Sequence, residues 1–450
     1  MSASPPTDVA TAVPRPGAAG ATLARALYSA LLRLLLPVIL LRYWWRGVRE
    51  PGYRQAWGQR LGFGATQPPG AIWVHAVSLG ETRAAAALVD ALRLRLPGMA
   101  LLLTHGTATG RTAGQALLQA GDRQAWLPLD TPGAVRRFFA RQRPRLGVLM
   151  ETEIWPNLLH EAHRQSVPML LANARLSARS ARIGERLAVL LRPAAATLAD
   201  ALAQTDADAL RLRASGAPQV AVCGNLKFDM QPAPAQLTLG RRWRDAIGRP
   251  VVLAAITREG EEAALLAAWA RAKAGAGGAD ALLIVVPRHP QRFDEVAALL
   301  GGCGLRIARR SGWGEMPSAG DLAVDAWLGD SMGEMPLYYA ASDVALLGGS
   351  FAPLGGHNLI EAAACGCPLV IGPSTFNFAQ AAEQAIDAGA AWRAKDIEQG
   401  LQHALALATG EAGTLAGARA SALAFAAAHR GAADRMAERI VARLSGPAAR

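Results

Sequence analysis

Cysteine and lysine are scarce in this sequence. Its 450 residues include only four cysteines, at positions 223, 303, 365 and 367, and three lysines, at positions 227, 273 and 395. Four cysteines cannot form a disulfide scaffold for a chain of this length, and their spacing matches no zinc motif. We therefore expect buried thiols in a reducing compartment. Hydrophobic residues make up 51% of the chain and charged residues 18%, which excludes wholesale disorder.

Acidic residues are too few to balance the arginines, and the formal net charge is +12. Such a charge suits an anionic partner, which can be a nucleic acid, an anionic lipid or a phosphorylated substrate. The arginines are scattered, and the sequence has no helix-turn-helix, zinc-finger or RNA-binding signature. We therefore expect no nucleic acid among the partners.

The N-terminal region predicts contact with a membrane. Residues 1–22 are rich in Ala, Pro, Gly and Thr and predict a disordered lead-in, and residues 26–41 form an apolar run. This run is shorter than the roughly 20 residues that span a bilayer, and it is followed by tryptophan and arginine at 42–46, which are typical of a membrane interface. We expect an anchor at 23–47, monotopic or single-pass, with its basic flank on the cytoplasmic leaflet. The alternative is a core helix of a soluble domain.

Short apolar runs alternate with polar loops and Ala/Leu-rich helices, first in one half of the chain and then in the other. The runs predict parallel strands covered on both faces, at 71–77, 99–104, 146–150 and 168–172 in the first half and at 250–255, 281–286, 344–347 and 368–371 in the second.

This pattern predicts an α/β fold of two facing, doubly wound, Rossmann-like domains with an N-terminal membrane-anchor helix. The domains are expected at 48–230 and 245–425, joined by a Pro-rich linker at 231–244, and a C-terminal helix at 426–450 can cross back to the first domain. Since ligands bind beyond the carboxyl ends of such strands, we expect the site in the cleft between the domains.

The most specific motif is Gly355-Gly-His-Asn-x-x-Glu361, which follows a strand and a Gly-rich loop and precedes a Gly-x-Pro. Backbone N–H groups at a helix start near Asn358 can hold a phosphate, and Glu361 can accept from ribose hydroxyls. The alternative is a loop that only turns a corner. No Gly-x-Gly-x-x-Gly follows the first strand of either half, so a dinucleotide-binding dehydrogenase is excluded.

Two further loops of the second half carry polar groups. Arg288 follows a strand and can neutralise a phosphate, while His289 either orients the phosphate or caps the loop. The loop at 329–334 is rich in small and polar residues whose backbone can hold a base or a phosphate, and its Glu334 can also be only an early-helix acid.

The first half offers carboxylates at two strand ends. Glu81 belongs to a Ser-x-x-Glu turn, which fits a helix capping box and equally a general base. Glu151 and Glu153 follow another strand. Asp206 and Asp208 indicate a helix N-cap rather than a metal site, and we expect no metal.

Together these motifs resemble the 3-deoxy-D-manno-oct-2-ulosonic acid (Kdo) transferases of lipopolysaccharide assembly, which have the GT-B fold. The matching runs follow the family order between residues 27 and 430, at 53–63, 75–81, 150–157, 173–180, 224–229, 287–292, 329–334, 355–361 and 372–377. One departure is Ile256-Thr-Arg258, where family members usually have Ser-Thr-His.

The resemblance implies an inverting enzyme on the cytoplasmic face of the inner membrane, without cofactor or metal. It would transfer Kdo from CMP-Kdo to the tetraacyl disaccharide lipid A precursor, beside anionic lipid. The resemblance makes Glu81 the general base and assigns transition-state stabilisation to Glu151 and Lys227. It assigns CMP-Kdo binding to Pro287, Arg288, Met332, Gly333, Glu334, Asn358, Leu359, Ile360 and Glu361. The alternatives are a GT-B transferase for another nucleotide sugar and a non-catalytic lipid-binding protein on the same frame.

Overall fold

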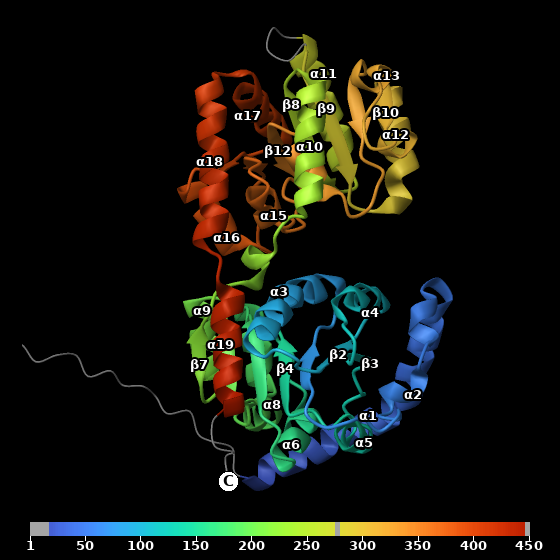
Figure 1. Ribbon diagram of the computed structural model, residues 1–450, viewed down its shortest axis with the longest axis vertical. Helices are drawn as coiled ribbons and strands as arrows, with labels where there is room; N and C mark the ends of the chain where they lie inside the picture. The colour runs from blue at the N-terminus through green and yellow to red at the C-terminus, as the bar shows by residue number, and fades with distance from the viewer. Residues whose placement is uncertain (1–17, 275–279, 446–450) are drawn as a thin grey trace, which may run out of the picture. The chain divides into compact units, whose positions relative to one another are not determined.

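The computed structural model of the protein describes residues 18–274 and 280–445. Within these residues the chain forms two compact units, which are described separately (Figure 1). Unit 1 contains the chain up to Leu226 and the segment from Gly431, and unit 2 runs from Lys227 to Arg430. Residues 1–17 of the expected lead-in lie outside the described residues. Residues 18–22, which were expected to be disordered, are helical and form the start of the first helix.

Unit 1 is built on a seven-stranded, wholly parallel sheet with the order β3-β2-β1-β4-β5-β6-β7. Its strands are β1 (Ile72–His75), β2 (Leu101–His105), β3 (Arg123–Trp126), β4 (Leu146–Met150), β5 (Met169–Ala174), β6 (Asp200–Ala203) and β7 (Val220–Val222). Successive side chains of β1 enter cores on opposite faces of the sheet, with Val74 on one face and Trp73 on the other. This burial on both faces explains the continuous apolar runs in the sequence.

Helices cover both faces of this sheet. They are α1 (Ala18–Arg49), α2 (Trp57–Arg60), α3 (Leu79–Arg95), α4 (Ala108–Gly114), α5 (Pro132–Gln142), α6 (Pro156–Arg164), α7 (Ala178–Arg186), α8 (Ala188–Ala195), α9 (Asp206–Ala214) and α19 (Ala432–Ser445). Helix α19 returns from the far end of the chain, and its Met436 and Ile440 are buried in the same core as Leu88 of α3. Within the described residues, the C-terminal segment expected at 426–450 is thus divided between the end of unit 2 and this helix.

Unit 2 repeats the architecture with the strand order β10-β11-β9-β8-β12-β13-β14, again wholly parallel. Its strands are β8 (Val251–Thr257), β9 (Leu282–Pro287), β10 (Ile307–Arg309), β11 (Ala326–Leu328), β12 (Val344–Leu347), β13 (Leu369–Ile371) and β14 (Ala391–Arg393). Its helices are α10 (Pro234–Ile247), α11 (Glu261–Ala274), α12 (Phe293–Gly302), α13 (Ala319–Leu322), α14 (Met335–Ala340), α15 (Leu359–Ala364), α16 (Ala379–Asp387), α17 (Ile397–Thr409) and α18 (Ala412–Ala428). Two parallel, doubly wound sheets confirm the predicted fold class.

The segment expected as a linker, 231–244, is largely helical. Pro234 stands in the first turn of α10, where a helix needs no N–H from the residue, and Trp243 of the same helix is fully buried. The prolines therefore mark the start of a packed helix rather than a free connection. The chain enters unit 2 earlier, at Lys227.

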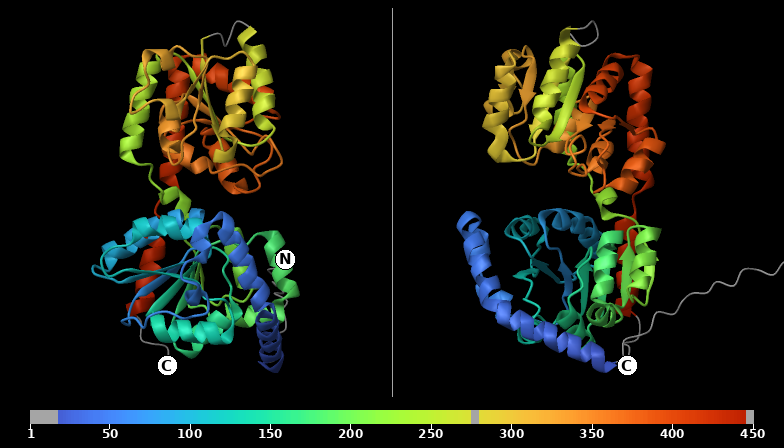
Figure 2. Two further views of the ribbon diagram at one scale, coloured as in Figure 1. Left: turned by 90° about the vertical axis from the view of Figure 1, so that its right-hand side faces the viewer. Right: turned by 180° about the vertical axis from the view of Figure 1, so that it is seen from behind.

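Helix α1 is long and apolar enough to cross a membrane, by length and composition. In this structure it lies along unit 1 and bends around it, with Pro37 inside the helix (Figure 2). Its inner face is held by hydrogen bonds from the Tyr28 hydroxyl to Asp130 (3.0 Å) and from the Ser29 hydroxyl to Asn157 (3.1 Å). The opposite face exposes what we call the outer stripe: Leu23, Leu27, Leu31, Leu34, Val38, Leu41, Trp45 and Val48.

Candidate active site

The sheet of unit 1 changes winding direction between β1 and β4, which are neighbours in the sheet but not in the chain. The loops that follow two such strands diverge and leave a crevice at their carboxyl ends. Glu81 follows β1, and Glu151 and Glu153 follow β4. The three carboxylates of the first half thus gather at this switch point.

Glu81 is both a helix-capping residue and an oriented carboxylate. Ser78 is the N-cap of α3, and its hydroxyl accepts from the Glu81 N–H at 3.4 Å. In return the Glu81 carboxylate accepts from the Val77 N–H at 2.8 Å and from the Ser78 hydroxyl at 2.9 Å. Burial raises the pKa of Glu81, and the negative charge of Glu151 adds to this effect.

The two acids after β4 differ in their surroundings. Glu151 adopts a left-handed backbone conformation with φ of 58°, which is unusual for a residue with a side chain. Glu153 accepts a hydrogen bond from the Trp155 indole N–H at 2.6 Å. Burial raises the pKa of Glu153 to about 7, and the negative charges of Glu81 and Glu151 contribute. Sequence reasoning placed Glu153 beside Glu151 at a strand end, a location that favours the site, and made the two acids the next candidates for the general base after Glu81.

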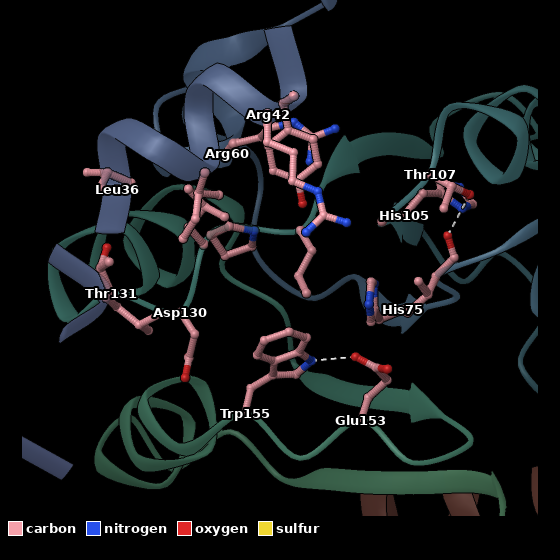
Figure 3. A pocket seen from close by; sticks show the side chains of 18 of the residues that line it. Leu36, Arg42, Arg60, His75, His105, Thr107, Asp130, Thr131, Glu153 and Trp155 are labelled. Carbon is pink, nitrogen blue, oxygen red and sulfur yellow. Dashed lines mark hydrogen bonds between the residues drawn. The ribbon is translucent and has the colours of Figure 1, made fainter. Parts of the chain in front are cut away.

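A cavity of about 420 Å³ opens between α1 and this end of the unit 1 sheet (Figure 3). Leu32, Leu36 and Ile39 of α1 form an apolar wall. Other parts of the lining include Val77 and the basic side chain of Arg46. Arg42 and Arg60 lie on one side of the cavity, with Glu153 and Trp155 across from them (Figure 3). Val77 lines the cavity, and its backbone N–H donates to the Glu81 carboxylate. The cavity therefore borders the carboxylate cluster.

Burial shifts the pKa values of three polar residues that line this cavity in the direction that favours their neutral forms. Burial lowers the pKa of His75 to about 3 and that of His105 to about 4. Burial also raises the pKa of Asp130 to about 7, although its carboxylate accepts from the backbone N–H groups of Asn157 (3.1 Å) and Leu158 (2.8 Å). The positive charges of the cavity therefore come from arginines.

In unit 2 the switch point lies between β8 and β12. The Gly-rich loop after β12 is organised by Glu261, which the sequence analysis did not single out. Its carboxylate accepts from the backbone N–H groups of Gly349 (2.8 Å), Ala352 (3.2 Å) and Arg258 (2.9 Å). Glu261 thus ties the loop after β12 to the loop after β8.

Basic groups gather beside this loop. Burial, together with the positive charges of Arg288 and Arg258, lowers the pKa of His357 to about 4. The His357 Nε2 atom is buried and has no hydrogen-bond partner among the described residues. Arg288 is exposed just after β9, and its backbone N–H donates to the Thr257 carbonyl at 3.0 Å. Arg258, the departure from the family pattern, therefore adds to a cationic surface that suits a phosphate or a carboxylate.

The other predicted donor-site residues have mixed environments. Asn358 is the N-cap of α15, and its side-chain oxygen accepts from the Ile360 N–H at 3.2 Å. The side chains of Leu359 and Ile360 are buried in the core of unit 2. Glu361 is half-buried in the first turn.

The remaining predicted residues lie in two places in unit 2. Glu334 is paired with the Arg310 guanidinium through two contacts of 3.0 Å, beside the exposed Met332 and Gly333. Pro287 is the last residue of β9 and is buried. The Lys227 ammonium lies 5.0 Å from the ring centroid of Phe378.

No set of ligands for a metal ion is evident among the described residues. Residues 18–274 and 280–445 contain no group of three His, Cys, Asp or Glu side chains arranged to hold an ion. Asp208 instead completes the N-cap of α9, where its N–H donates to the Thr205 hydroxyl at 3.1 Å, as the sequence predicted.

Comparison with known proteins points to one family. Residues 55–230 match the family model described as 3-deoxy-D-manno-octulosonic-acid transferase (kdotransferase). The 3-deoxy-D-manno-octulosonic acid transferase of Bordetella pertussis is 51% identical over 85% of this chain and 91% of its own length. The transferase of the same name from Haemophilus influenzae is 36% identical over 79% of this chain and 83% of its own.

A solved structure of a glycosyltransferase from Rickettsia africae shares the fold. Its TM-score is 0.55, with 11% identity, over 83% of this chain and 98% of that one. At this level of identity the likeness concerns the arrangement of the chain and not its chemistry.

Proposed function

Because this chain belongs to the Kdo transferase family, we propose that it transfers Kdo from CMP-Kdo to the tetraacyl disaccharide precursor of lipid A. Such a transfer is a step of lipopolysaccharide core synthesis. The observation that carries the proposal is the cluster at the switch point of unit 1, where the Glu81 carboxylate is oriented by Val77 and Ser78 next to a cavity with apolar and basic walls.

Glu81 acts as the general base in this proposal. It takes the proton of an acceptor hydroxyl while the oxygen attacks the ketose carbon of Kdo that bears the carboxylate. The bond from that carbon to the phosphate oxygen breaks, and CMP leaves with the electron pair. Attack from the face opposite to CMP inverts the anomeric centre. The raised pKa of Glu81 makes it a stronger base than an ordinary carboxylate.

Unit 2 binds the donor in this proposal. Arg288, with Arg258 beside it, neutralises the charge that develops on the departing monophosphate, and the loop held by Glu261 receives the nucleotide. The remaining assignments to Pro287, Met332, Gly333, Glu334 and the 358–361 segment stay proposals from the family resemblance. The same holds for Lys227 and Glu151 as groups that stabilise the transition state.

The acceptor is a lipid, and the proposed location is the cytoplasmic face of the inner membrane. Helix α1 supports this location because its outer stripe is apolar and exposed, while Arg42, Arg46 and Arg49 follow toward its end. The apolar inner residues Leu32, Leu36 and Ile39 then bring lipid-compatible surface to the cavity beside Glu81.

One assay tests the proposal. The full-length protein is incubated in detergent with the tetraacyl disaccharide bisphosphate and either CMP-Kdo or a panel of UDP-sugars, and the lipid products are weighed by mass spectrometry. We expect a mass increase of one or more Kdo residues with CMP-Kdo only. A product formed from a UDP-sugar would indicate a transferase for another nucleotide sugar, and no product from any donor would indicate a non-catalytic lipid-binding protein.

A further inference from the structure

Arg60 is a buried cation without a counter-ion. It is the last residue of α2, and only 2% of it is exposed. Its guanidinium lies between two aromatic rings, 4.0 Å from the ring centroid of Tyr43 and 3.9 Å from that of Trp126. Within the described residues it forms no ion pair, and its Nε and Nη2 atoms have no hydrogen-bond partner. A buried charge in this state is destabilising unless an anion completes its surroundings.

The cavity beside Arg60 is suited to an anion. Arg60 lines it together with Arg42 and Arg46 of α1, while its two acids, Glu153 and Asp130, are largely buried and both have pKa values raised to about 7. The two rings enclose the guanidinium, and its Nε and Nη2 atoms are buried. An anion in the cavity therefore contacts the guanidinium at its remaining nitrogen, Nη1, which can donate a charge-assisted hydrogen bond to an oxygen of a phosphate or carboxylate.

The apolar wall of the cavity favours an anion that is attached to hydrocarbon over a free inorganic ion. Leu32, Leu36 and Ile39 of α1 provide apolar surface that a free inorganic ion would leave uncovered. A molecule that carries a phosphate next to hydrocarbon covers both kinds of wall. The volume of about 420 Å³ holds a phosphate with the adjoining part of a sugar or acyl chain.

We propose that Arg60 anchors a phosphate group of the lipid acceptor in this cavity. The proposal deepens the proposed function and rests on it for the identity of the acceptor. A phosphate on Arg60 places the attached sugar along the wall formed by Val77 and Glu153, and the Val77 N–H holds the carboxylate of Glu81. Arg60 is thus a positioning residue that fixes which acceptor hydroxyl reaches the base.

The test compares phosphorylated and dephosphorylated acceptors on three proteins. The acceptors are the tetraacyl disaccharide bisphosphate and its phosphatase-treated forms that lack one or both phosphates, each in detergent micelles. The proteins are the wild type, Arg60→Lys, and Arg111→Gln as a matched control. Arg111 also lies over the Trp126 ring, at 5.0 Å, but it does not line the cavity and donates to Gln59 at 3.2 Å.

Binding is titrated first without donor, so the result does not depend on Kdo transfer. We expect the wild type to bind the bisphosphate about 10- to 100-fold more tightly than the form that lacks the recognised phosphate, and Arg60→Lys to lose most of this preference. Arg111→Gln should keep it. In the transfer assay Arg60→Lys should raise the KM for acceptor and leave that for CMP-Kdo unchanged.

Equal wild-type affinity for phosphorylated and dephosphorylated acceptors would overturn the proposal even if Arg60→Lys failed to fold. An unchanged preference in a folded Arg60→Lys would also overturn it. A KM increase for CMP-Kdo alone would assign Arg60 to a donor anion instead. If the preference is present but no donor yields product, the proposed function fails and the phosphate site stands.

Discussion

At the scale of single residues, Glu81 and Glu153 at the switch point of unit 1 are held in an environment that opposes their ionisation. Burial raises the pKa of Glu81 and of Glu153, and each of these carboxylates also feels the negative charge of Glu151. A catalytic base needs a raised pKa, while the fold is more stable when fewer of these groups are charged. Raising the pH therefore produces the ionised base that catalysis needs, but at this cluster it lowers the stability of the fold.

We predict that Glu153→Gln changes the pH dependence of stability. An unfolded glutamate titrates near pH 4.3, whereas Glu153 titrates at about 7 in the folded protein. The folded state thus binds this proton more tightly, and the stability it contributes is lost as pH rises through 7. Glutamine keeps an acceptor for Trp155 and removes the charge. The variant should melt at a higher temperature than the wild type. This difference in melting temperature should be about 2–4 °C larger at pH 8 than at pH 5. A difference that does not vary with pH would contradict this account.

Individual residues were predictable from sequence where the chemistry is local. Thr205 and Asp208 form the expected N-cap, and Ser78 with Glu81 form the expected capping turn. Glu261 and Arg60 were not predicted, because their roles depend on partners far along the chain. Glu261 accepts from Gly349, 88 positions away, and Arg60 is enclosed by Trp126.

At the scale of elements, one face of α1 packs on unit 1 and the opposite face is exposed. Hydrogen bonds from Tyr28 and Ser29 fix its inner face to unit 1, and the outer stripe repeats every three or four residues on the other side. This arrangement is an amphipathic helix that is docked on its own unit rather than a free anchor.

We predict that the outer stripe holds the protein on the membrane. Leu34 and Val38 are 77% and 62% exposed, and the double variant Leu34→Glu with Val38→Glu replaces apolar contact with charge. Each lost side chain removes about 1.5–3 kcal/mol of burial in lipid, so membrane partitioning should fall more than tenfold per residue. The melting temperature should change little. Leu94→Glu is the control, since Leu94 of α3 is 80% exposed but lies outside the stripe. Pelleting of the double variant with membranes as in the wild type would refute the prediction.

The Gly-rich loop of unit 2 depends on close backbone approach. A Cβ on Gly348 would collide with the carbonyl oxygen of Ile256, near the end of β8. We predict that Gly348→Ala displaces the Gly-rich loop from the end of β8 and weakens CMP-Kdo binding tenfold or more in a calorimetric titration. Gly301→Ala is the matched control, because a Cβ at this helical position meets no atom within 4 Å. Equal affinities of the two variants would show that the loop does not shape the donor site.

The strands at the centre of each sheet were predictable, whereas the four edge strands and also β6 and β11, next to two of them, were not. The runs expected at 146–150 and 344–347 coincide with β4 and β12, since these strands are buried on both faces and consist of apolar residues. β3 begins with Arg123 and Gln124 at the sheet edge, and β14 is only three residues long, so neither produces an apolar run. The cavity beside α1 was beyond sequence reasoning, because it depends on which face of α1 docks.

At the scale of the whole molecule, excess arginine matches a reaction in which both substrates carry phosphate. The net charge of +12 comes almost entirely from arginine, whose charge persists even when it is partly buried. Arg42, Arg46 and Arg60 line the cavity of unit 1, and Arg258 and Arg288 lie near His357 in unit 2. The leaving group is a monophosphate, which carries less charge than a sugar diphosphate.

We predict that the transfer reaction survives chelation. Arginine side chains meet the charge of departing CMP in this account, so EDTA at millimolar concentration should leave the rate of Kdo transfer within about twofold of the untreated enzyme. The rate is measured by product mass over time in detergent. Loss of activity with EDTA that Mg²⁺ restores would contradict the account.

The measurement that tests the central claim most directly is made on Glu81→Gln. Glutamine can still accept from Val77 and Ser78, so the cap, the melting temperature and the affinity for CMP-Kdo should remain near wild-type values. It cannot take a proton, so turnover should fall by about 10²-fold or more. Asp321→Asn, which makes the same change in the capping box of α13 in unit 2, is the control and should keep full turnover. Near-normal turnover of a folded Glu81→Gln that still binds CMP-Kdo would reduce Glu81 to a helix cap and contradict the account.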